Sequence, residues 1–599
     1  MKQLMTGNEA IARGFYEAGG HVASAYPGTP STEILENMSQ YKEIYSEWTP
    51  NEKVALEVAV GASIAGARSL AAMKHVGVNV AADPLFTFAY TGVNGAFMLV
   101  TADDPGMHSS QNEQDNRYYA KFAKIAMVEP SDSQEAKDFV KEALRISEEF
   151  DIPVLYRVTT RVCHSKSLVE PGEREEFAVK EYVKNVPKFV STPANAKKLR
   201  VKVEERLKKL EEYSNSTFLN REEINGNATV GVITSGISYQ YSKEVFGDSV
   251  SYLKLGYTYP LPMDKIRNFA SKFETVYVIE ELEPFIEEQM KAAGIKCIGK
   301  EKISNIGELN PDIIAAALLG KEIVTPQTII DTRNIAINRP PTLCAGCPHR
   351  GLFYTLSKEK NLVIAGDIGC YTLGVAPPLN AMDTVICMGA SVSAGHGMKK
   401  VFEIYGTEEN KGKDKHVIGV IGDSTFFHSG ITGLIDVVYN KSSLVTIIVD
   451  NRITGMTGHQ ENPGTGYTLM GEKTGVVDIE AIVKAIGVKN IDVVNPLDLE
   501  QTKTKIKDAL KRDEPSVIIT RWPCVLKKFS EEDKKEFGCE LTVKYKVNED
   551  KCRSCRMCLK SGCPALSFDK FSHINPDMCV GCAVCAQICP FDAIEKVGE

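Results

Sequence analysis

Short apolar runs alternate with amphipathic stretches from the start of the chain through residue 165. Residues 7–19 place Ile11, Phe15 and Tyr16 at helical spacing, and Gly19 follows as a helix-ending residue. Strand-like apolar runs come later, within AFMLVTADDPG and IPVLYRVTT. Strands separated by helices are typical of parallel sheets. The pattern therefore predicts an α/β domain with a parallel sheet over residues 1–170.

The pattern changes over residues 171–227, where Lys and Glu are frequent. The stretch ANAKKLRVKVEERLKKLEEY predicts a long exposed helix, and we interpret this segment as a charged connector. The alternation returns in ATVGVITSG, SYLKLGYTYPLP and TVYVIEE, which predicts a second α/β unit over residues 228–330. A third unit is expected over residues 339–527, followed by a cysteine-rich tail over residues 545–599. The predicted fold class is thus a multidomain α/β protein.

Composition narrows the functional classes. With 599 residues the chain is too long for a single core. A net charge of −8 argues against a nucleic-acid partner, because such proteins usually present a basic face. The first residues lack the apolar core of a signal peptide, and no apolar run is long enough to span a membrane. We therefore expect a cytoplasmic protein without a membrane partner.

The chain contains sixteen cysteines, and half of them lie in a repeat near the C-terminal end. NEDKCRSCRMC at residue 548 recurs as NPDMCVGCAVC at residue 575, and each copy is followed by a distal cysteine before a proline. Three cysteines at this spacing can bind one four-iron cluster, whose fourth ligand comes from the other copy. Zinc is the alternative, because C-x2-C pairs also bind zinc. The repeat predicts one cluster on Cys552, Cys555, Cys558 and Cys589, and another on Cys579, Cys582, Cys585 and Cys563.

This tail resembles bacterial two-cluster ferredoxins, apart from a longer spacer, Leu559–Gly562, before the first distal cysteine. Because the spacer lies between ligands of different clusters, it need not distort either cluster. We expect it to bulge, which Gly562 makes easier.

Acidic and amide side chains follow two neighbouring strands of the third unit. VIGVIG and SLVTIIVDN are strand-like, and the segment between them is helical, so the strands should be parallel. Asp423 and Asn451 then come just past the carboxyl ends of these strands, where open α/β sheets bind ligands. Oxygen ligands placed together suit Mg²⁺ that also holds phosphates. The alternative is an ordinary turn with a capping aspartate.

The same residues resemble the GDG…NN motif of thiamine diphosphate enzymes. Gly422, Asp423 and Ser424 match its first part, with Ser424 in place of the usual glycine. Asp450 replaces the first asparagine of the second part. The resemblance implies that Asp423, Asn451 and the backbone carbonyl of Ile453 hold Mg²⁺, which in turn holds the cofactor's diphosphate.

The first domain resembles the pyrimidine-binding domain of 2-oxoacid:ferredoxin oxidoreductases. TPNEKVALEVAVGASIAGARSL is similar to the helix of that family in which a glutamate precedes closely packed glycines, here Gly61 and Gly66. The resemblance implies that Glu52 supplies the carboxyl group that protonates the cofactor's aminopyrimidine ring, with Glu57 as the alternative. YPGTPSTE is similar to the family's YPxTP loop, which implies that Thr29 contacts the substrate carboxylate; a proline-rich turn is the alternative. A substrate-binding arginine of several relatives has no counterpart in TADDPGMHSSQNEQ.

Four further cysteines follow an order that resembles a proximal 4Fe–4S site in this family. The family has a C-x2-C pair, a third cysteine, and a fourth after the Mg²⁺ motif. Separate buried thiols are the alternative. The resemblance implies a third cluster on Cys344, Cys347, Cys370 and Cys524.

The order of the units completes the resemblance, which covers most of the chain. A pyrimidine domain, a transketolase-C-terminal-like domain (228–330), a diphosphate domain and a two-cluster tail resemble the large (alpha) subunit of indolepyruvate:ferredoxin oxidoreductases. The resemblance implies anaerobic oxidative decarboxylation of arylpyruvates with coenzyme A to aryl-acetyl-CoA and CO2, with electrons passing to ferredoxin. It also implies a smaller beta subunit and a dimer of heterodimers.

Three alternatives to this function remain at this point. The first is another 2-oxoacid specificity. The second is a non-oxidative thiamine-dependent decarboxylase or carboligase, which would not need the cysteine tail. The third is an electron-transfer subunit with a degenerate diphosphate domain, which would not need Asp423 and Asn451.

Overall fold

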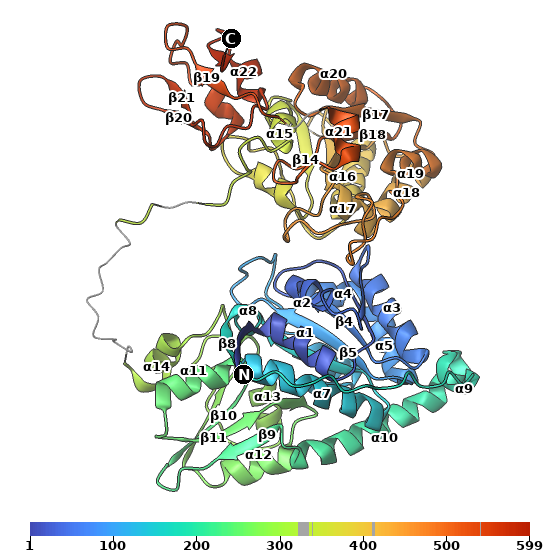
Figure 1. Ribbon diagram of the computed structural model, residues 1–599, viewed down its shortest axis with the longest axis vertical. Helices are drawn as coiled ribbons and strands as arrows, with labels where there is room; N and C mark the ends of the chain where they lie inside the picture. The colour runs from blue at the N-terminus through green and yellow to red at the C-terminus, as the bar shows by residue number, and fades with distance from the viewer. Residues whose placement is uncertain (322–334, 338–339, 410–411, 413, 539–540, 599) are drawn as a thin grey trace. The chain divides into compact units, whose positions relative to one another are not determined.

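The computed structural model describes the chain except for residues 322–334, 338–339, 410–411, 413, 539–540 and 599. The chain forms two compact units (Figure 1): Met1–Ile329 with Leu469–Gly471, and Ile330–Thr468 with Glu472–Glu599. The predicted boundary between residues 330 and 339 lies largely outside the described residues. Each unit contains a parallel sheet flanked by helices, which confirms the predicted α/β fold class.

The first unit is built on a seven-stranded sheet in which six strands run parallel. Its first helix, α1 (Gly7–Glu17), begins at Thr6, whose hydroxyl accepts a hydrogen bond from the Glu9 N–H. Gly19, at φ +64°, follows the helix as predicted. The carboxyl ends of the parallel strands share one edge of the sheet, where ligands bind in such folds. In order across the sheet, the strands are β12 (Tyr257–Tyr259), β6 (Ala126–Val128), β7 (Val154–Thr159), β5 (Phe97–Asp103), β4 (Ser69–Lys74), β2 (Val22–Ala25) and β3 (Tyr45–Trp48).

The residues after 228 contribute to two sheets. Strand β12 joins the first sheet antiparallel to β6, and its register with β6 shifts between Tyr257 and Tyr259. The remaining strands form a four-stranded sheet that also includes a strand from the predicted connector. In order, this sheet contains β13 (Thr275–Ile279), β10 (Val230–Ser235), β11 (Ser251–Leu255) and β9 (Asn220–Glu223).

The long charged helix of the predicted connector is present as α10 (Pro193–Ser216). One face of it is buried, in contrast to the exposed helix that its charge predicts. Leu199, Val203 and Leu210 lie on that face, at helical spacing, and the helix contacts α5 (Ala82–Thr91) and α12 (Met263–Ala270). The helix is therefore part of the first unit.

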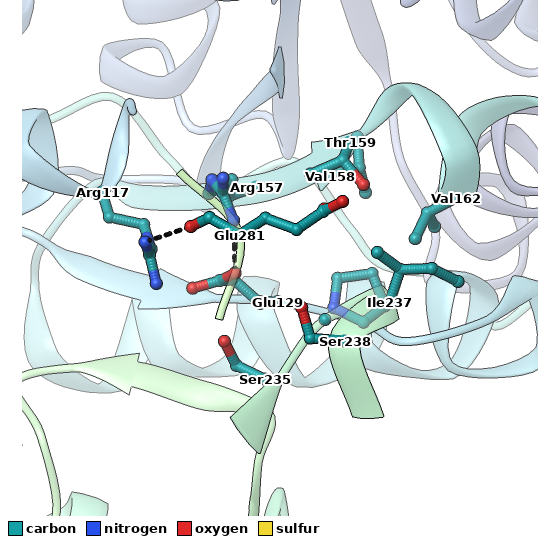
Figure 2. Close-up of a pocket in the computed structure, with 12 residues that line it drawn as sticks. Arg117, Glu129, Arg157, Val158, Thr159, Val162, Ser235, Ile237, Ser238 and Glu281 are labelled. Carbon is teal, nitrogen blue, oxygen red and sulfur yellow. Dashed lines mark hydrogen bonds and ion pairs between the residues drawn. The ribbon is translucent and has the colours of Figure 1, made fainter. Parts of the chain in front are cut away.

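A cluster of buried charges lies where the first sheet meets the residues after 228 (Figure 2). Arg117 donates a hydrogen bond of 2.6 Å to the carboxylate of Glu280, and Arg157 donates one of 2.7 Å to Glu129. Arg117 also binds the backbone carbonyl of Glu281. Burial raises the pKa of the Glu281 carboxyl group to about 7. The cluster therefore contains an acid that exchanges its proton near neutral pH.

The second unit is built on a five-stranded sheet in which every strand is parallel to its neighbours. Its central strands are continuous apolar runs, as expected for a sheet that helices cover on both faces. Asp423 follows one of these strands directly, and Asn451 follows the neighbouring one. The strands, in order, are β14 (Leu362–Ala365), β15 (His416–Gly422), β16 (Val445–Asp450), β18 (Ser516–Arg521) and β17 (Asn490–Val494).

The helix between β15 and β16 differs in detail from its prediction. It starts as a short turn, α17 (Asp423–Thr425), continues as a π-turn over Phe426–Gly430, and only then becomes α18 (Ile431–Tyr439). In the sequence, Ile431, Leu434, Ile435 and Val438 fall at helical spacing, which predicts a buried Ile435, but this side chain is 49% exposed. A Cβ at Gly433 would lie 2.9 Å from Ser393 Oγ, so the neighbouring helix α16 (Ala390–Tyr405) packs closely on the Gly433 side of α18. Ile435, two residues along the helix, points to a different side and is therefore exposed.

The tail packs against the diphosphate domain within the second unit. Leu497 of that domain forms an apolar cluster with Val584 and Ile588 from α22 (Val584–Ile588). Gln587 donates a hydrogen bond to the Leu497 carbonyl at 2.7 Å. The tail contains two small antiparallel pairs, β19 (Tyr545–Val547) with β22 (Ile594–Lys596) and β20 (Leu566–Phe568) with β21 (Ser572–Ile574). In the part of the chain that the structure describes, no helix has the length and apolar character needed to cross a membrane.

Candidate cofactor and cluster sites

The carboxyl edge of the second sheet brings the predicted Mg²⁺ residues onto two adjoining loops. Strands β15 and β16 are paired through Gly422 and Val449, so Asp423 and Asn451 leave the sheet side by side. The loops are linked by a hydrogen bond of 3.1 Å from Thr454 Oγ1 to Ser424 Oγ. Asp423, Asn451 and Ile453 are all buried.

Asp423 is a buried carboxylate that forms no ion pair among the described residues, and the charge of Arg452 only partly opposes the rise of its pKa. Burial, reinforced by the nearby Asp450, raises its pKa to about 7. Asp450 itself is paired with Arg521 at 2.8 Å and does not need a metal. A buried carboxylate is costly unless a cation compensates it. The residues at this edge therefore fit a divalent cation held by oxygen ligands.

Two residues that the sequence analysis missed support this edge. Asn462 donates a hydrogen bond of 3.4 Å to Asp423 Oδ2. Asp367, just past β14, accepts hydrogen bonds from the N–H groups of Gly389 and Ser391 and so fixes the start of α16. Asp367 had a signal, because its GD dipeptide follows an apolar strand as Gly422–Asp423 does. Asn462 had none, because its partner lies far away in sequence.

In the first unit, the structure separates the two candidate glutamates of the pyrimidine domain. Glu52 is the first residue of α3 (Glu52–Ile64) and is 4% exposed, whereas the side chain of Glu57 is 45% exposed and pairs with Lys53. Asn51 caps this helix by accepting a hydrogen bond from the Val54 N–H at 2.9 Å. Glu52 packs on Gly77, where a Cβ would come within 2.7 Å of its side chain. The buried position fits a carboxyl group that meets a ring nitrogen away from water.

The glycines of α3 differ from their prediction. Gly61 lies on the exposed face, and a Cβ there would meet no described atom of this chain within 4 Å. Gly66 lies beyond the helix, at φ +103°, with the Lys180 carbonyl 2.0 Å from where its Cβ would be. Gly66 therefore serves a turn, and within this chain Gly61 has no close packing to serve.

The loop of Thr29 lies beside a lysine that the sequence analysis did not select. Lys74 ends β4, and its side-chain carbons lie 3.3 Å from where a Cβ of Gly28 would be. Its ammonium donates to the Ser109 carbonyl at 2.9 Å, and Ser109 Oγ donates to the Thr29 carbonyl at 3.3 Å. Burial lowers the pKa of Lys74, and the charges of Asp104 and Glu52 oppose that shift. The lysine is thus a partly desolvated cation close to both predicted residues.

The four cysteines of the predicted third cluster gather next to the loop that contains Asn451. Burial raises the pKa of Cys347 to about 12 and that of Cys370 to about 11, and the thiols of Cys344 and Cys524 act in the same direction on both. Gly455 links the two sites, because its Cβ would lie 3.6 Å from Asn451 Nδ2 and 3.7 Å from Cys370 Sγ. The residues fit a cluster close to the diphosphate end of the cofactor.

The tail cysteines gather in the two predicted sets. One set lines a cavity, and the N–H of Ala593 donates to Cys589 Sγ at 3.3 Å. In the other set, burial raises the pKa of Cys585, and the neighbouring thiols reinforce the shift. Among the described residues, no three His, Cys, Asp or Glu side chains are placed to hold a single metal ion. A cubane is larger, so its ligands surround a cavity. The two sets are Cys552, Cys555, Cys558 and Cys589, and Cys563, Cys579, Cys582 and Cys585.

Three protein-family models match the chain. Residues 13–209 match "Pyruvate flavodoxin/ferredoxin oxidoreductase, thiamine diP-bdg". Residues 367–520 match "Thiamine pyrophosphate enzyme, C-terminal TPP binding domain", and residues 572–595 match "4Fe-4S binding domain". These ranges contain Glu52, Asp423 with Asn451, and four cysteines of the tail, Cys579, Cys582, Cys585 and Cys589.

Curated relatives match the chain along its length. The "Indolepyruvate oxidoreductase subunit IorA" of Archaeoglobus fulgidus is 44% identical over 99% of this chain and 97% of its own. The protein of the same name from Pyrococcus horikoshii is 41% identical over 100% of this chain and 97% of its own. The one from Methanothermobacter marburgensis is 39% identical, again over 100% and 97%.

Proposed function

Because the chain belongs to the family of IorA subunits of indolepyruvate oxidoreductase, we propose that it catalyses the oxidative decarboxylation of arylpyruvates, indole-3-pyruvate among them. Coenzyme A would accept the acyl group to give an aryl-acetyl-CoA and CO2, and ferredoxin would accept the electrons. Thiamine diphosphate and 4Fe–4S clusters are its cofactors. One observation supports the proposal most directly: the cysteines of the proximal site adjoin the loop of Asn451.

The residues of the two thiamine domains have separate tasks in this reaction. Asp423, Asn451 and the carbonyl of Ile453 would hold Mg²⁺ and through it the diphosphate. Glu52 would hold a proton at N1′ of the aminopyrimidine, and its buried position keeps water away from that proton. When bound, thiamine diphosphate supplies the electron sink that decarboxylation of a 2-oxoacid requires.

Thr29 and Lys74 would bind the substrate carboxylate. The backbone carbonyl of Thr29 and the ammonium of Lys74 both bind Ser109, which places the two residues at one end of the sheet. Lys74 has one hydrogen-bond partner within the described part of the chain, so two of its three N–H donors remain for a ligand. Lys74 thereby supplies the cation that the segment TADDPGMHSSQNEQ lacks.

The remaining cysteines would carry electrons out of the site. The cluster on the proximal set, Cys344, Cys347, Cys370 and Cys524, would receive electrons first. The two clusters on the eight tail cysteines would then deliver them to ferredoxin. A smaller beta subunit would complete the enzyme as a dimer of heterodimers. All cysteines in the described residues are unpaired, which suits a reducing cytosol, and we place the reaction there.

The proposal is tested by an anaerobic assay with the beta subunit present. Ferredoxin reduction is measured with indole-, phenyl- and hydroxyphenylpyruvate, and with pyruvate and 2-oxoglutarate as comparison substrates. We expect reduction with the arylpyruvates that stops without coenzyme A. Preference for pyruvate or 2-oxoglutarate would support another specificity, and CO2 release without ferredoxin reduction would support a non-oxidative decarboxylase.

A further inference from the structure

Arg350 is a fully buried cation without a carboxylate partner among the described residues. It lies in the first turn of α15 (His349–Leu356) and is 2% exposed. Its guanidinium donates hydrogen bonds to backbone carbonyls, to Cys344 at 2.8 Å, to Ser561 at 3.2 Å and to Leu343. Carbonyl dipoles satisfy its N–H groups, but they do not neutralise its charge. A buried charge of this kind is costly unless an anion compensates it.

The groups around Arg350 come from two different cluster sites. Burial lowers the pKa of Arg350, and the thiols of Cys563, Cys347, Cys344 and Cys582 oppose that shift. Cys344 and Cys347 belong to the proximal set, whereas Cys563 and Cys582 belong to one set of the tail. We call the cluster on Cys563, Cys579, Cys582 and Cys585 the inner cluster, and the one on Cys552, Cys555, Cys558 and Cys589 the outer cluster. Arg350 lies between the proximal and inner sites.

The long spacer of the tail provides this contact. Its residues form a 3-10 turn (Cys558–Ser561) that Gly562 ends at φ +66°, in place of the expected bulge. A Cβ at Gly562 would lie 3.2 Å from Arg350 Nη1. The turn thus presents the Ser561 carbonyl to the arginine and brings the adjacent Cys563 towards it.

Other contacts hold the tail in this position. A Cβ at Gly346 would lie 2.0 Å from a methyl carbon of Val580, which places the inner cysteine loop directly on the C-x2-C loop of the proximal site. Gln587 accepts a hydrogen bond from the Leu499 N–H at 3.1 Å. The position of Arg350 between the two sites is therefore fixed by several independent contacts.

We propose that Arg350 is the shared counter-charge of the proximal and inner clusters, and that it makes both easier to reduce. This inference rests on the proposed function, because it requires clusters at both sites. A four-iron cluster bound by four thiolates is an anion, and each electron it accepts adds a negative charge beside the guanidinium. Arginine stays protonated, so one electron moves between the two clusters without a proton. The outer cluster, whose cysteines are not among the thiols that act most strongly on Arg350, would take the electron onward.

The test compares two variants of the full-length protein with its clusters in place. R350Q removes the charge and keeps hydrogen-bond donors, whereas R350K keeps the charge and loses the planar fork. Midpoint potentials of all clusters are measured by redox titration followed by electron paramagnetic resonance. R512Q, at a partly exposed arginine that pairs with Asp492 of the second sheet and belongs to none of the cluster sites, serves as the control.

In R350Q we expect the equilibrium constants for one-electron reduction of the proximal and inner clusters to fall at least tenfold. This corresponds to midpoint potentials at least 59 mV lower, while the potential of the outer cluster remains unchanged. R350K and R512Q should stay close to the native values. Unchanged potentials in R350Q would overturn the proposal. If R350Q does not assemble its clusters, the potentials measured in R350K test the proposal instead. Native potentials in R350K would support the counter-charge role of Arg350, and shifted potentials would overturn it.

The iron content of the native chain distinguishes failure of this proposal from failure of the proposed function. A native chain with about eight irons would contradict the third cluster and with it the proposed electron path. A native chain with about twelve irons whose potentials do not respond to R350Q would contradict the role of Arg350 alone.

Discussion

The backbone N–H of Cys524 donates a hydrogen bond to the carbonyl of Asn451. This bond, 2.9 Å long, joins a predicted iron ligand to a predicted Mg²⁺ ligand through the main chain. Cys524 follows β18, and β18 lies next to β16 in the sheet, so the two loops leave neighbouring strands. The sheet therefore fixes the proximal cluster site relative to the diphosphate site.

Replacing Cys524 by serine should remove one cluster and leave the other two. Iron content should fall from about twelve to about eight atoms per chain, because each cluster contains four irons. Thiamine diphosphate binding should persist, since the bond between residues 524 and 451 involves only the backbone. C387S, at an exposed cysteine outside the three sets, is the control. Equal iron in C524S and the native chain would contradict the third cluster.

Replacing Glu52 by glutamine should impair the chemical step more than cofactor binding. An amide cannot exchange the proton that the aminopyrimidine needs, and general acid–base groups contribute on the order of 10²–10⁴ to rate. We expect kcat to fall within that range while bound thiamine diphosphate, measured after denaturation, stays near the native amount. E57Q, one turn along the same helix, should keep native activity. Native kcat in E52Q together with a low kcat in E57Q would assign the role to Glu57.

Replacing Lys74 by methionine should weaken binding of the 2-oxoacid. A charged hydrogen bond contributes roughly 1.5–3 kcal/mol, so KM for indolepyruvate should rise about 10- to 100-fold, with a smaller change in kcat. K74R should recover much of the affinity. K53M, at an exposed lysine of α3, is the control. A native KM in K74M would show that Lys74 only balances the charges of Glu52 and Asp104.

The charge cluster of the first unit should make stability depend on pH. Burial raises the pKa of Glu281 to about 7, so the folded state binds this proton more tightly than the unfolded chain. Stability from this group is therefore present at acidic pH and is lost as pH rises towards 7. We expect a lower unfolding temperature by calorimetry at pH 7.5 than at pH 5.5.

E281Q should reduce that pH difference, because glutamine does not ionise, whereas E283Q at the exposed neighbouring glutamate should leave it intact. An equal pH difference in E281Q and the native protein would assign the effect to other acids, such as Asp103, whose pKa burial also raises to about 7.

Local patterns in the sequence predicted the features that depend on a few neighbouring residues. The cysteine repeat predicted which thiols gather in the tail, and the placement of Asp423 and Asn451 after apolar strands predicted their shared edge. Features that depend on distant contacts were not predictable. Strand β12 joins a sheet formed more than a hundred residues earlier, and Arg350 meets the Ser561 carbonyl across 211 positions of sequence. In the sequence, nothing distinguishes Lys74 from other residues at strand ends, because its contact with Gly28 forms only in the folded chain.

The central claim is that decarboxylation and cluster reduction are coupled in one enzyme. Its most direct test is a single turnover of the anaerobic enzyme with its beta subunit, in which CO2 release and bleaching of the cluster absorbance are followed together. With indolepyruvate and coenzyme A, we predict both signals in the native protein and neither in D423N, whereas D436N, at an exposed aspartate of α18, should behave like the native protein. Release of CO2 with unchanged cluster absorbance would contradict the account.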